Sequence, residues 1–233
     1  MPARHLILLP PSEGKAPEGD GPPWAPGTMA VEELDPVRRR VARAAGLTRA
    51  IGRNPTMAAI ERYTGVLYRE LDAAGLPAAA RRRLARDVLI VSGLWGLVAP
   101  EDPICDYRLK MSARAGDLGK LSTFWRPALS EALAPRATGR LLWDLLPIEH
   151  SAAVDWAVLA PRQRITVRFV DAEDRTISHW NKLLKGSLVR WLVTTPPQGI
   201  DDLASFDHPQ GYRYDPASTV VDGRHATVVL RGS

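Results

Sequence analysis

The sequence predicts a single domain of the mixed α+β class spanning residues 1–233. Short apolar runs typical of buried strands are interleaved with amphipathic stretches typical of helices, without the regular strand–helix repeat of a doubly wound fold. With 45% hydrophobic and 24% charged residues, a chain of 233 residues can bury one sizeable core. No long low-complexity stretch separates two halves, so one domain is the better interpretation.

The first predicted element is a strand over residues 5–9, because this short apolar run is closed by Pro10 and Pro11. Residues 10–30 follow as a loop rich in Pro and Gly, with little apolar periodicity. Such a segment is ordered only where side-chain contacts or a ligand hold it. A loop directly after a buried strand is also a common place for function.

The middle of the chain is predicted to contain helices over residues 31–45, 77–87 and 122–133 and strands over residues 87–92, 141–146 and 164–170. The first of these helices has Pro36 near its first turn, where proline is tolerated. The first strand is a continuous apolar run typical of a central strand, and it breaks at Gly93-Leu-Trp-Gly96. The last strand alternates apolar and polar residues, which indicates that one of its faces is exposed.

The last third of the chain is predicted to end in a helix and a hairpin. Residues 176–193 read as strand-like at first and helical from about Lys182. The tail, residues 217–233, is predicted to fold back on itself, because two β-rich runs are joined by Asp222-Gly223. This dipeptide supplies the positive φ that a tight hairpin turn requires.

Composition bounds the class of protein. No apolar run approaches the roughly 20 residues of a membrane span, and the apolar segment at the start is too short for a secretory signal. We therefore expect a soluble, cytoplasmic protein. The single cysteine, Cys105, excludes an intrachain disulfide framework and is expected to be packed in the core. The five histidines are scattered without metal-ligand spacing, so we expect no metal site.

The net charge of +5 and pI near 9.6 permit a polyanionic partner without proving one. Lys182 and Lys185 are one helical turn apart near an expected helix N-terminus, where the helix dipole favours an anion, and Arg190 lies further around. These three residues are candidates for phosphate binding, although a solvated basic face is an equal alternative.

Two further segments could carry chemistry. Residues 106–111 alternate strictly, so as a strand they would send Asp106, Arg108 and Lys110 to one face, either a solvent-facing edge or a charged floor. Ser12-Glu-Gly-Lys15 matches Ser-x-x-Lys spacing, but Pro11 and Gly14 favour a loop over the buried helix that such a serine nucleophile needs. The dispersed aromatic side chains are expected to be core.

Several blocks of the sequence form one recognisable set. The set begins with Leu6-Ile-Leu-Leu-Pro-Pro-Ser-Glu-Gly-Lys15 and Tyr63-Thr-Gly-Val-Leu-Tyr68. Its most specific part is Val91-Ser-Gly-Leu-Trp-Gly-Leu97, followed by Asp102-Pro-Ile and Asp106-Tyr-Arg-Leu-Lys-Met111. With Phe124-Trp125, residues 182–190 and Gly211-Tyr212, the blocks cover nearly the whole chain. Together they resemble the YaaA family of peroxide stress proteins.

The resemblance implies a fold specific to that family, a curved mixed β-sheet surrounded by helices, with no known cofactor. It also implies nucleic-acid binding by a basic surface cleft and a role in limiting oxidative damage to DNA when iron is high. Family binding is associated with a helix-hairpin-helix element, and Gly93 and Gly96 have some of its character. Their backbone amides are therefore candidates for phosphate contact, and the alternative is that they only turn the chain after a strand.

The sequence departs from the family pattern in two places. Where many members carry Asn-Leu-Ala-Ser-x-Glu-Tyr, this chain has Asp144-Leu-Leu-Pro-Ile-Glu-His150, which keeps Glu149. Where members have Lys-x-x-Arg-Gly, Lys185 replaces the arginine and loses the planar fork that grips phosphate in two places. A divergent member can be recruited to another function, because a fold does not fix one.

The leading hypothesis is a nucleic-acid-binding stress-protection protein, with Arg108 and Lys110 joining the cations of residues 182–190 as sequence-nonspecific DNA contacts.

The alternative is an enzyme acting on a nucleotide, nucleobase or other small anion. Its cleft would gather Ser12, Glu13, Lys15, Asp102, Tyr107, Arg108, Glu149, Lys182 and Lys185. Lys15, Glu149 or Tyr107 would then act in catalysis. A third possibility is an interaction protein whose basic faces only keep it soluble. The oligomeric state does not follow from the sequence.

Overall fold

The computed structural model describes residues 3–176 and 181–232 and has one mixed eight-stranded sheet at its centre. The path through the sheet is β4-β3-β1-β6-β7-β10-β8, and β9 pairs with β10 beside β8. The strands are β1 (His5–Leu9), β3 (Val88–Ser92), β4 (Gly96–Val98), β6 (Leu141–Asp144), β7 (Gln163–Val170), β8 (Arg213–Tyr214), β9 (Val220–Asp222) and β10 (His225–Arg231). The predicted α+β class is confirmed.

The middle of this sheet is parallel. Strands β3, β1, β6, β7 and β10 run the same way, and β4, β8 and β9 add antiparallel edges. β1 and β3 are buried along their whole length, as their continuous apolar sequences predict for central strands. The hairpin between β9 and β10 turns at Gly223 with φ +55°, which confirms the turn predicted from Asp222-Gly223.

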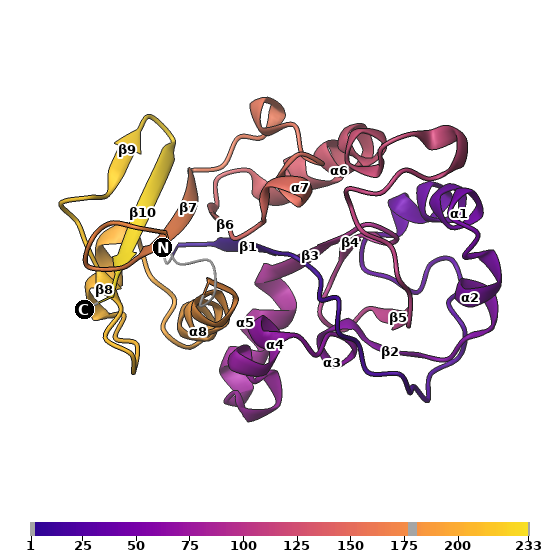
Figure 1. Ribbon diagram of the computed structural model, residues 1–233, viewed down its shortest axis with the longest axis horizontal. Coiled ribbons are helices and arrows are strands. Elements are labelled where there is room, and N and C mark those ends of the chain that lie inside the picture. The colour runs from indigo at the N-terminus through magenta and orange to yellow at the C-terminus, as the bar shows by residue number, and fades with distance from the viewer. Residues whose placement is uncertain (1–2, 177–180, 233) are drawn as a thin grey trace.

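Helices cover both faces of the sheet, with α6 and α7 on one side and α4, α5 and α8 on the other (Figure 1). The α-helices are α1 (Asp35–Ala44), α2 (Thr48–Arg53), α3 (Ala59–Arg62), α4 (Val66–Leu71), α5 (Ala78–Asp87), α6 (Leu121–Ala137), α7 (Ile148–Ser151) and α8 (Asn181–Thr194). Short 3-10 turns are η1 (Glu32–Leu34), η2 (Ala73–Gly75), η3 (Gly116–Leu118), η4 (Trp156–Val158) and η5 (Ile200–Ser205). A small second sheet pairs β2 (Thr56–Ala58) with β5 (Pro103–Cys105). No helix within the described ranges is long and apolar enough to cross a membrane.

α8 crosses α4 at very close range. A Cβ atom at Gly186 would collide with the Leu67 carbonyl oxygen and with the Glu70 side chain. A glycine at this point of α8 therefore lets the two helix backbones touch. The contact places the first turn of α8 beside α4, which matters for the cavity described below.

One predicted strand is wrong. Residues 106–110 are extended but belong to no strand, because β5 ends at Cys105 and the chain then leaves its partner β2. The alternation itself is retained, since Asp106, Arg108 and Lys110 are exposed while Tyr107 and Met111 are buried. Burial of every second side chain produced a strand-like pattern without a neighbouring strand.

The strand-like start predicted for residues 176–193 falls largely on residues 177–180, which lie outside the described residues. The helix predicted from about Lys182 is confirmed by α8. Of the dispersed aromatic residues expected in the core, Tyr63, Tyr68, Trp95 and Trp125 are buried, Trp191 is half-buried against the core, and Trp180 lies outside the described residues. Cys105 is buried as well.

Candidate functional site

A cavity of about 1050 Å³ opens where the parallel strands β1 and β6 end. The chain leaves β1 into residues 10–15 and leaves β6 towards residues 147–150, and both segments line the cavity. β1 pairs with β3 on one side and with β6 on the other. The chain after β1 leads towards the β3 side of the sheet and the chain after β6 leads to β7 on the opposite side, so the two connections diverge here. In open sheets with parallel strands, ligands bind in the crevice at such a switch point.

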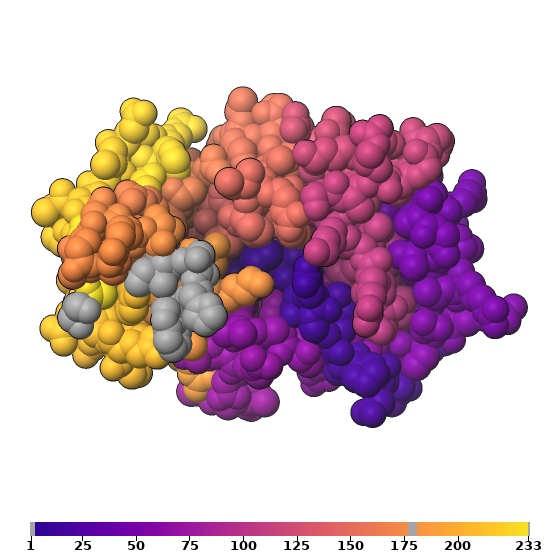
Figure 2. Space-filling model, in the orientation of Figure 1, coloured from indigo at the N-terminus to yellow at the C-terminus, as the bar shows by residue number. Residues whose placement is uncertain are grey.

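The cavity is visible as a hollow in the middle of the molecule, floored by the indigo N-terminal segment (Figure 2). Within the described ranges, its wall also includes the start of α4, the loop after β5, α7 and the first turn of α8. The lining residues are Pro10, Pro11, Ser12, Glu13, Gly14, Lys15, Thr64, Gly65, Val66, Leu67, Tyr68, Arg69, Tyr107, Arg108, Leu109, Lys110, Ser112, Ala113, Pro147, Glu149, His150 and Lys182.

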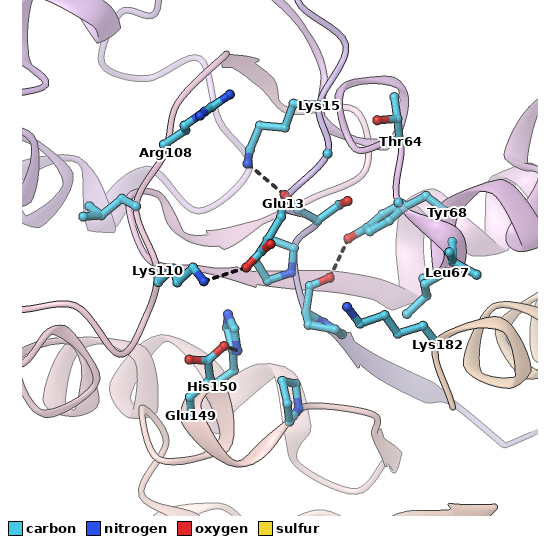
Figure 3. Close-up of a pocket in the computed structure, with 18 of the residues that line it drawn as sticks. Glu13, Lys15, Thr64, Leu67, Tyr68, Arg108, Lys110, Glu149, His150 and Lys182 are labelled. Carbon is cyan, nitrogen blue, oxygen red and sulfur yellow. Dashed lines mark hydrogen bonds and ion pairs between the residues drawn. The ribbon is translucent and has the colours of Figure 1, made fainter. Parts of the chain in front are cut away.

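Cationic side chains outnumber carboxylates around the cavity. The cations are Lys15, Arg69, Arg108, Lys110 and Lys182, and the carboxylates are Glu13 and Glu149. The pKa of Glu13 is lowered, first by its hydrogen bond with Lys110 and also by the charges of Lys182 and Lys15. Three lysines from separate parts of the chain therefore converge around one glutamate (Figure 3).

Lys15 is the most enclosed of these cations. Its Nζ donates a hydrogen bond to the Ser12 carbonyl oxygen at 2.8 Å and lies 4.4 Å from the centre of the Tyr107 ring. Burial lowers the pKa of Lys15, and the nearby charges of Asp106 and Glu13 oppose that shift. Because the amine bonds the Ser12 backbone, Ser12 and Lys15 do not form the hydroxyl–amine pair of a serine nucleophile.

A buried chain of hydroxyl groups lies under Lys15. The Tyr63 hydroxyl bonds the Tyr107 hydroxyl at 2.8 Å, which bonds Ser92 Oγ at 2.7 Å. Ser92 Oγ in turn accepts from the Trp95 amide at 3.1 Å. Desolvation raises the pKa of Tyr107 to about 12, so its phenol stays protonated at neutral pH. Tyr107 therefore supports Lys15 with its ring and holds its own hydroxyl away from the cavity.

Lys110 and Glu13 form an ion pair at 2.8 Å across the mouth of the cavity. Both side chains are exposed, so water and salt screen the pair and its net contribution to stability is small. The pKa of Lys110 is raised, first by the hydrogen bond with Glu13. A polyanion that enters the cavity can therefore replace Glu13 as the partner of Lys110.

Glu149 and His150 lie in the first turn of α7, on the other side of the cavity (Figure 3). His150 Nδ1 is 3.5 Å from Glu149 Oε1 and has no hydrogen-bond partner within the described residues. Burial lowers the pKa of His150, against the opposing charge of Glu149. A neutral imidazole beside a carboxylate can accept a proton from a ligand in the cavity.

The three cations predicted along the last helix separate in the structure. Lys182 reaches into the cavity, whereas Lys185 Nζ donates to the Leu145 carbonyl oxygen at 2.9 Å. Arg190 bonds the carbonyl oxygens of Leu71 at 2.9 Å and Asp72 at 2.8 Å, where α4 ends. Burial lowers the pKa of Lys185. Of the three, only Lys182 lines the cavity.

Three other predicted site residues lie away from it. Gly93 lies in the turn after β3 and Gly96 begins β4; a Cβ at Gly93 would meet the backbone of residues 109–111, and one at Gly96 would meet the Trp125 ring. Asp102 is buried and accepts from the amides of Ala30 at 2.7 Å and Ala99 at 2.8 Å. The space and hydrogen bonds of these residues are taken up by the chain itself, so they are not part of the site proposed below.

Sequence reasoning missed several lining residues, among them Thr64, Arg69, Ser112 and His150 as a cavity residue in its own right. Thr64 belongs to the Tyr63–Tyr68 block, which was noted for its likeness to a family but given no role. Arg69 and Ser112 stand in no motif, and only folding brings them to the cavity. In the part of the chain that the structure describes, no group of three His, Cys, Asp or Glu side chains could hold a metal ion.

Comparison with known proteins gives a consistent result. Residues 27–218 match the family model of the peroxide stress protein YaaA. A UPF0246 protein of Streptomyces coelicolor is 36% identical, over 94% of this chain and 95% of its own length. UPF0246 proteins of Corynebacterium glutamicum and Cereibacter sphaeroides are each 34% identical, over 81% and 77% of this chain and 84% and 71% of their own lengths.

Proposed function

We propose that this chain, which belongs to the YaaA family of peroxide stress proteins, protects DNA from oxidative damage by binding it in the cation-lined cavity. Family membership associates the chain with peroxide stress. DNA binding is supported by one observation: among the described residues, five cations and only two carboxylates line a single cavity. Phosphate contacts of this kind supply most of the affinity of sequence-nonspecific DNA binding.

The cations suit a phosphate backbone because they come from separate elements. Arg69, Arg108 and Lys182 are exposed at the cavity, on α4, the loop after β5 and α8 respectively. A ligand that contacts all three must extend across the cavity, as a chain of phosphates does. Lys15 lies deeper, against the ring of Tyr107.

A second candidate is an enzyme acting on a nucleotide or another small anion. It is favoured by the position of the cavity at the switch point between β1 and β6, where small phosphate-bearing ligands bind in related sheet architectures. Glu149 and His150 would then move protons, and the cations would hold the charge of the substrate.

The decisive experiment is fluorescence anisotropy of a labelled DNA duplex titrated with wild type, Lys182→Glu and Arg108→Glu/Lys182→Glu across a range of salt concentrations. Wild-type affinity is expected to fall log-linearly with salt. Each lost phosphate contact lowers the slope by about 0.9. Lys120→Glu is the matched control, because Lys120 is exposed at the start of α6 and does not line the cavity.

If wild type fails to bind DNA, or if the cavity variants bind as tightly as Lys120→Glu, the DNA proposal is wrong. Nucleotides and sugar phosphates should then be tested by calorimetry on the same set of variants. Binding of a small anion that depends on Lys182 supports the enzyme alternative.

A further inference from the structure

The amine of Lys15 differs from every other lysine of the chain in its surroundings. Among the described residues it makes no ion pair, whereas Lys110 at the mouth of the same cavity is paired with Glu13. Lys185 is enclosed as well, but its amine is turned to Leu145 and does not line the cavity. Lys15 thus combines enclosure with access to a ligand.

The position of this amine is fixed from below. The Tyr107 and Tyr63 rings lie 4.4 and 5.7 Å from Nζ, and the Ser12 carbonyl accepts one of its protons. Burial is the main cause of its lowered pKa, and Arg108 and Arg62 add to the shift. A lower pKa increases the fraction of neutral amine, which is the form that attacks a carbonyl carbon.

The groups around Lys15 define the class of ligand. Arg108 and Lys182 line the same cavity and suit phosphate oxygens. An amine nucleophile calls for an electrophilic carbon, and a sugar in its open-chain form provides one as an aldehyde. The ligand that satisfies both requirements is a phosphate-bearing sugar aldehyde, found free as a sugar phosphate or within DNA at a site that has lost its base.

We propose that Lys15 forms a Schiff base with the aldehyde of a phosphate-bearing sugar held in this cavity. The nitrogen lone pair forms a bond to the aldehyde carbon, and the C=O π electrons move to the oxygen. One proton then passes from nitrogen to that oxygen, which gives a carbinolamine. The second N–H proton is transferred to the hydroxyl group, which leaves as water while the nitrogen lone pair forms the C=N bond. No oxidant or reductant is needed. For the DNA-borne aldehyde this inference rests on the proposed function, and for a free sugar phosphate it does not.

The test is reductive trapping with cyanoborohydride, which converts the C=N bond to a stable amine. One arm uses a duplex with a single abasic site, and the other uses 2-deoxyribose 5-phosphate. Peptide mass mapping locates the adduct. We expect wild type and Lys120→Arg to carry it on Lys15, and Lys15→Arg to lose it while keeping a positive charge at that position.

The two arms separate this inference from the proposed function. Trapping on Lys15 in the DNA arm supports both, and trapping only with the free sugar phosphate supports the Schiff base with a small-molecule substrate. Intact-duplex anisotropy reports DNA binding independently of either arm. Absence of an adduct in both arms, or equal adduct in wild type and Lys15→Arg, overturns the inference even if intact DNA binds. Circular dichroism of Lys15→Arg checks that a lost adduct is not a lost fold.

Discussion

Arg38 on α1 and Arg62 on α3 bond to backbone carbonyls of other segments, whereas Lys15 and Lys182 line the cavity. Arg38 is fully buried and donates to Trp95 O and Leu97 O, each at 2.8 Å. Arg62, also fully buried, holds the loop after β1 through the carbonyls of Ala16 and Glu18. In this protein, the partners of a cationic side chain decide whether it holds the fold together or is available to a ligand. The number of cations alone does not decide this.

The largest effect is expected at the buried arginine. Arg38→Met should lower the free energy of unfolding by about 3–5 kcal/mol, because Asp35 would remain buried without its ion pair. The exposed neighbour is the control, and Arg39→Met should stay within about 0.5 kcal/mol of wild type. Urea denaturation measures both. Equal stability of the two variants would show that the buried Arg38 does not hold the fold together.

Lys182 and Lys185 lie on the same helix but differ in their partners. Lys185→Met should cost about 1–3 kcal/mol of stability, because it removes the charged donor to Leu145 O. Lys182→Met should change stability by less than about 0.5 kcal/mol, because its side chain is exposed, and should weaken DNA binding. Denaturation and anisotropy on the same samples check the division. If Lys182→Met proves the less stable variant, the assignment of roles is reversed.

A smaller effect is expected on stability when the pH is lowered. Burial lowers the pKa of His150, so between the folded pKa and 6.5 the unfolded chain binds more protons than the folded chain. The stability that depends on a neutral His150 is complete above pH 6.5 and is lost as the pH falls towards the pKa of His150 in the folded chain. His150→Gln should therefore flatten part of the loss of stability below pH 6.5, measured by urea melts at several pH values. The exposed His225→Gln is the control, and an equal flattening there would contradict the assignment.

The smallest effect is expected at the only cysteine. Burial raises the pKa of Cys105 to about 11, so at pH 8 only roughly 0.1% of the thiol is ionised. Modification by a disulfide reagent should be slow in the native protein and fast in urea. We also expect Cys105→Ala to keep any peroxide protection that the wild type gives cells. Rapid native modification, or loss of protection in the variant, would point to thiol chemistry in place of the cavity.

The fold was predictable where one local pattern decides the outcome. The apolar run of residues 5–9, the break at Gly93 and the Asp222-Gly223 turn each determine their own element, and all three are confirmed. For residues 106–111, the alternation predicted correctly which side chains are buried and which are exposed, but the predicted strand is absent. Alternation reports burial and does not report a hydrogen-bonded neighbouring strand.

The site was predictable only in part. Lys15, Glu13 and Lys182 line the cavity. The grouping of Lys182 with Lys185 and Arg190 followed helical spacing alone. Spacing cannot show that a carbonyl of another segment, such as Leu145 O, already bonds an amine. Arg69 was missed for the converse reason, because no motif marks a residue that reaches the cavity through the packing of α4.

The contact of α8 with α4 at Gly186 has a mechanical consequence. Since the two backbones touch there, Lys182 and Arg69 stand on one packed pair of helices, and we expect this wall of the cavity to keep its shape when a ligand binds. The loop of residues 106–110 has no strand partner, and its Arg108 and Lys110 side chains are exposed. Adjustment to ligands of different width should therefore come from Arg108 and Lys110, with the opposite wall serving as the fixed reference.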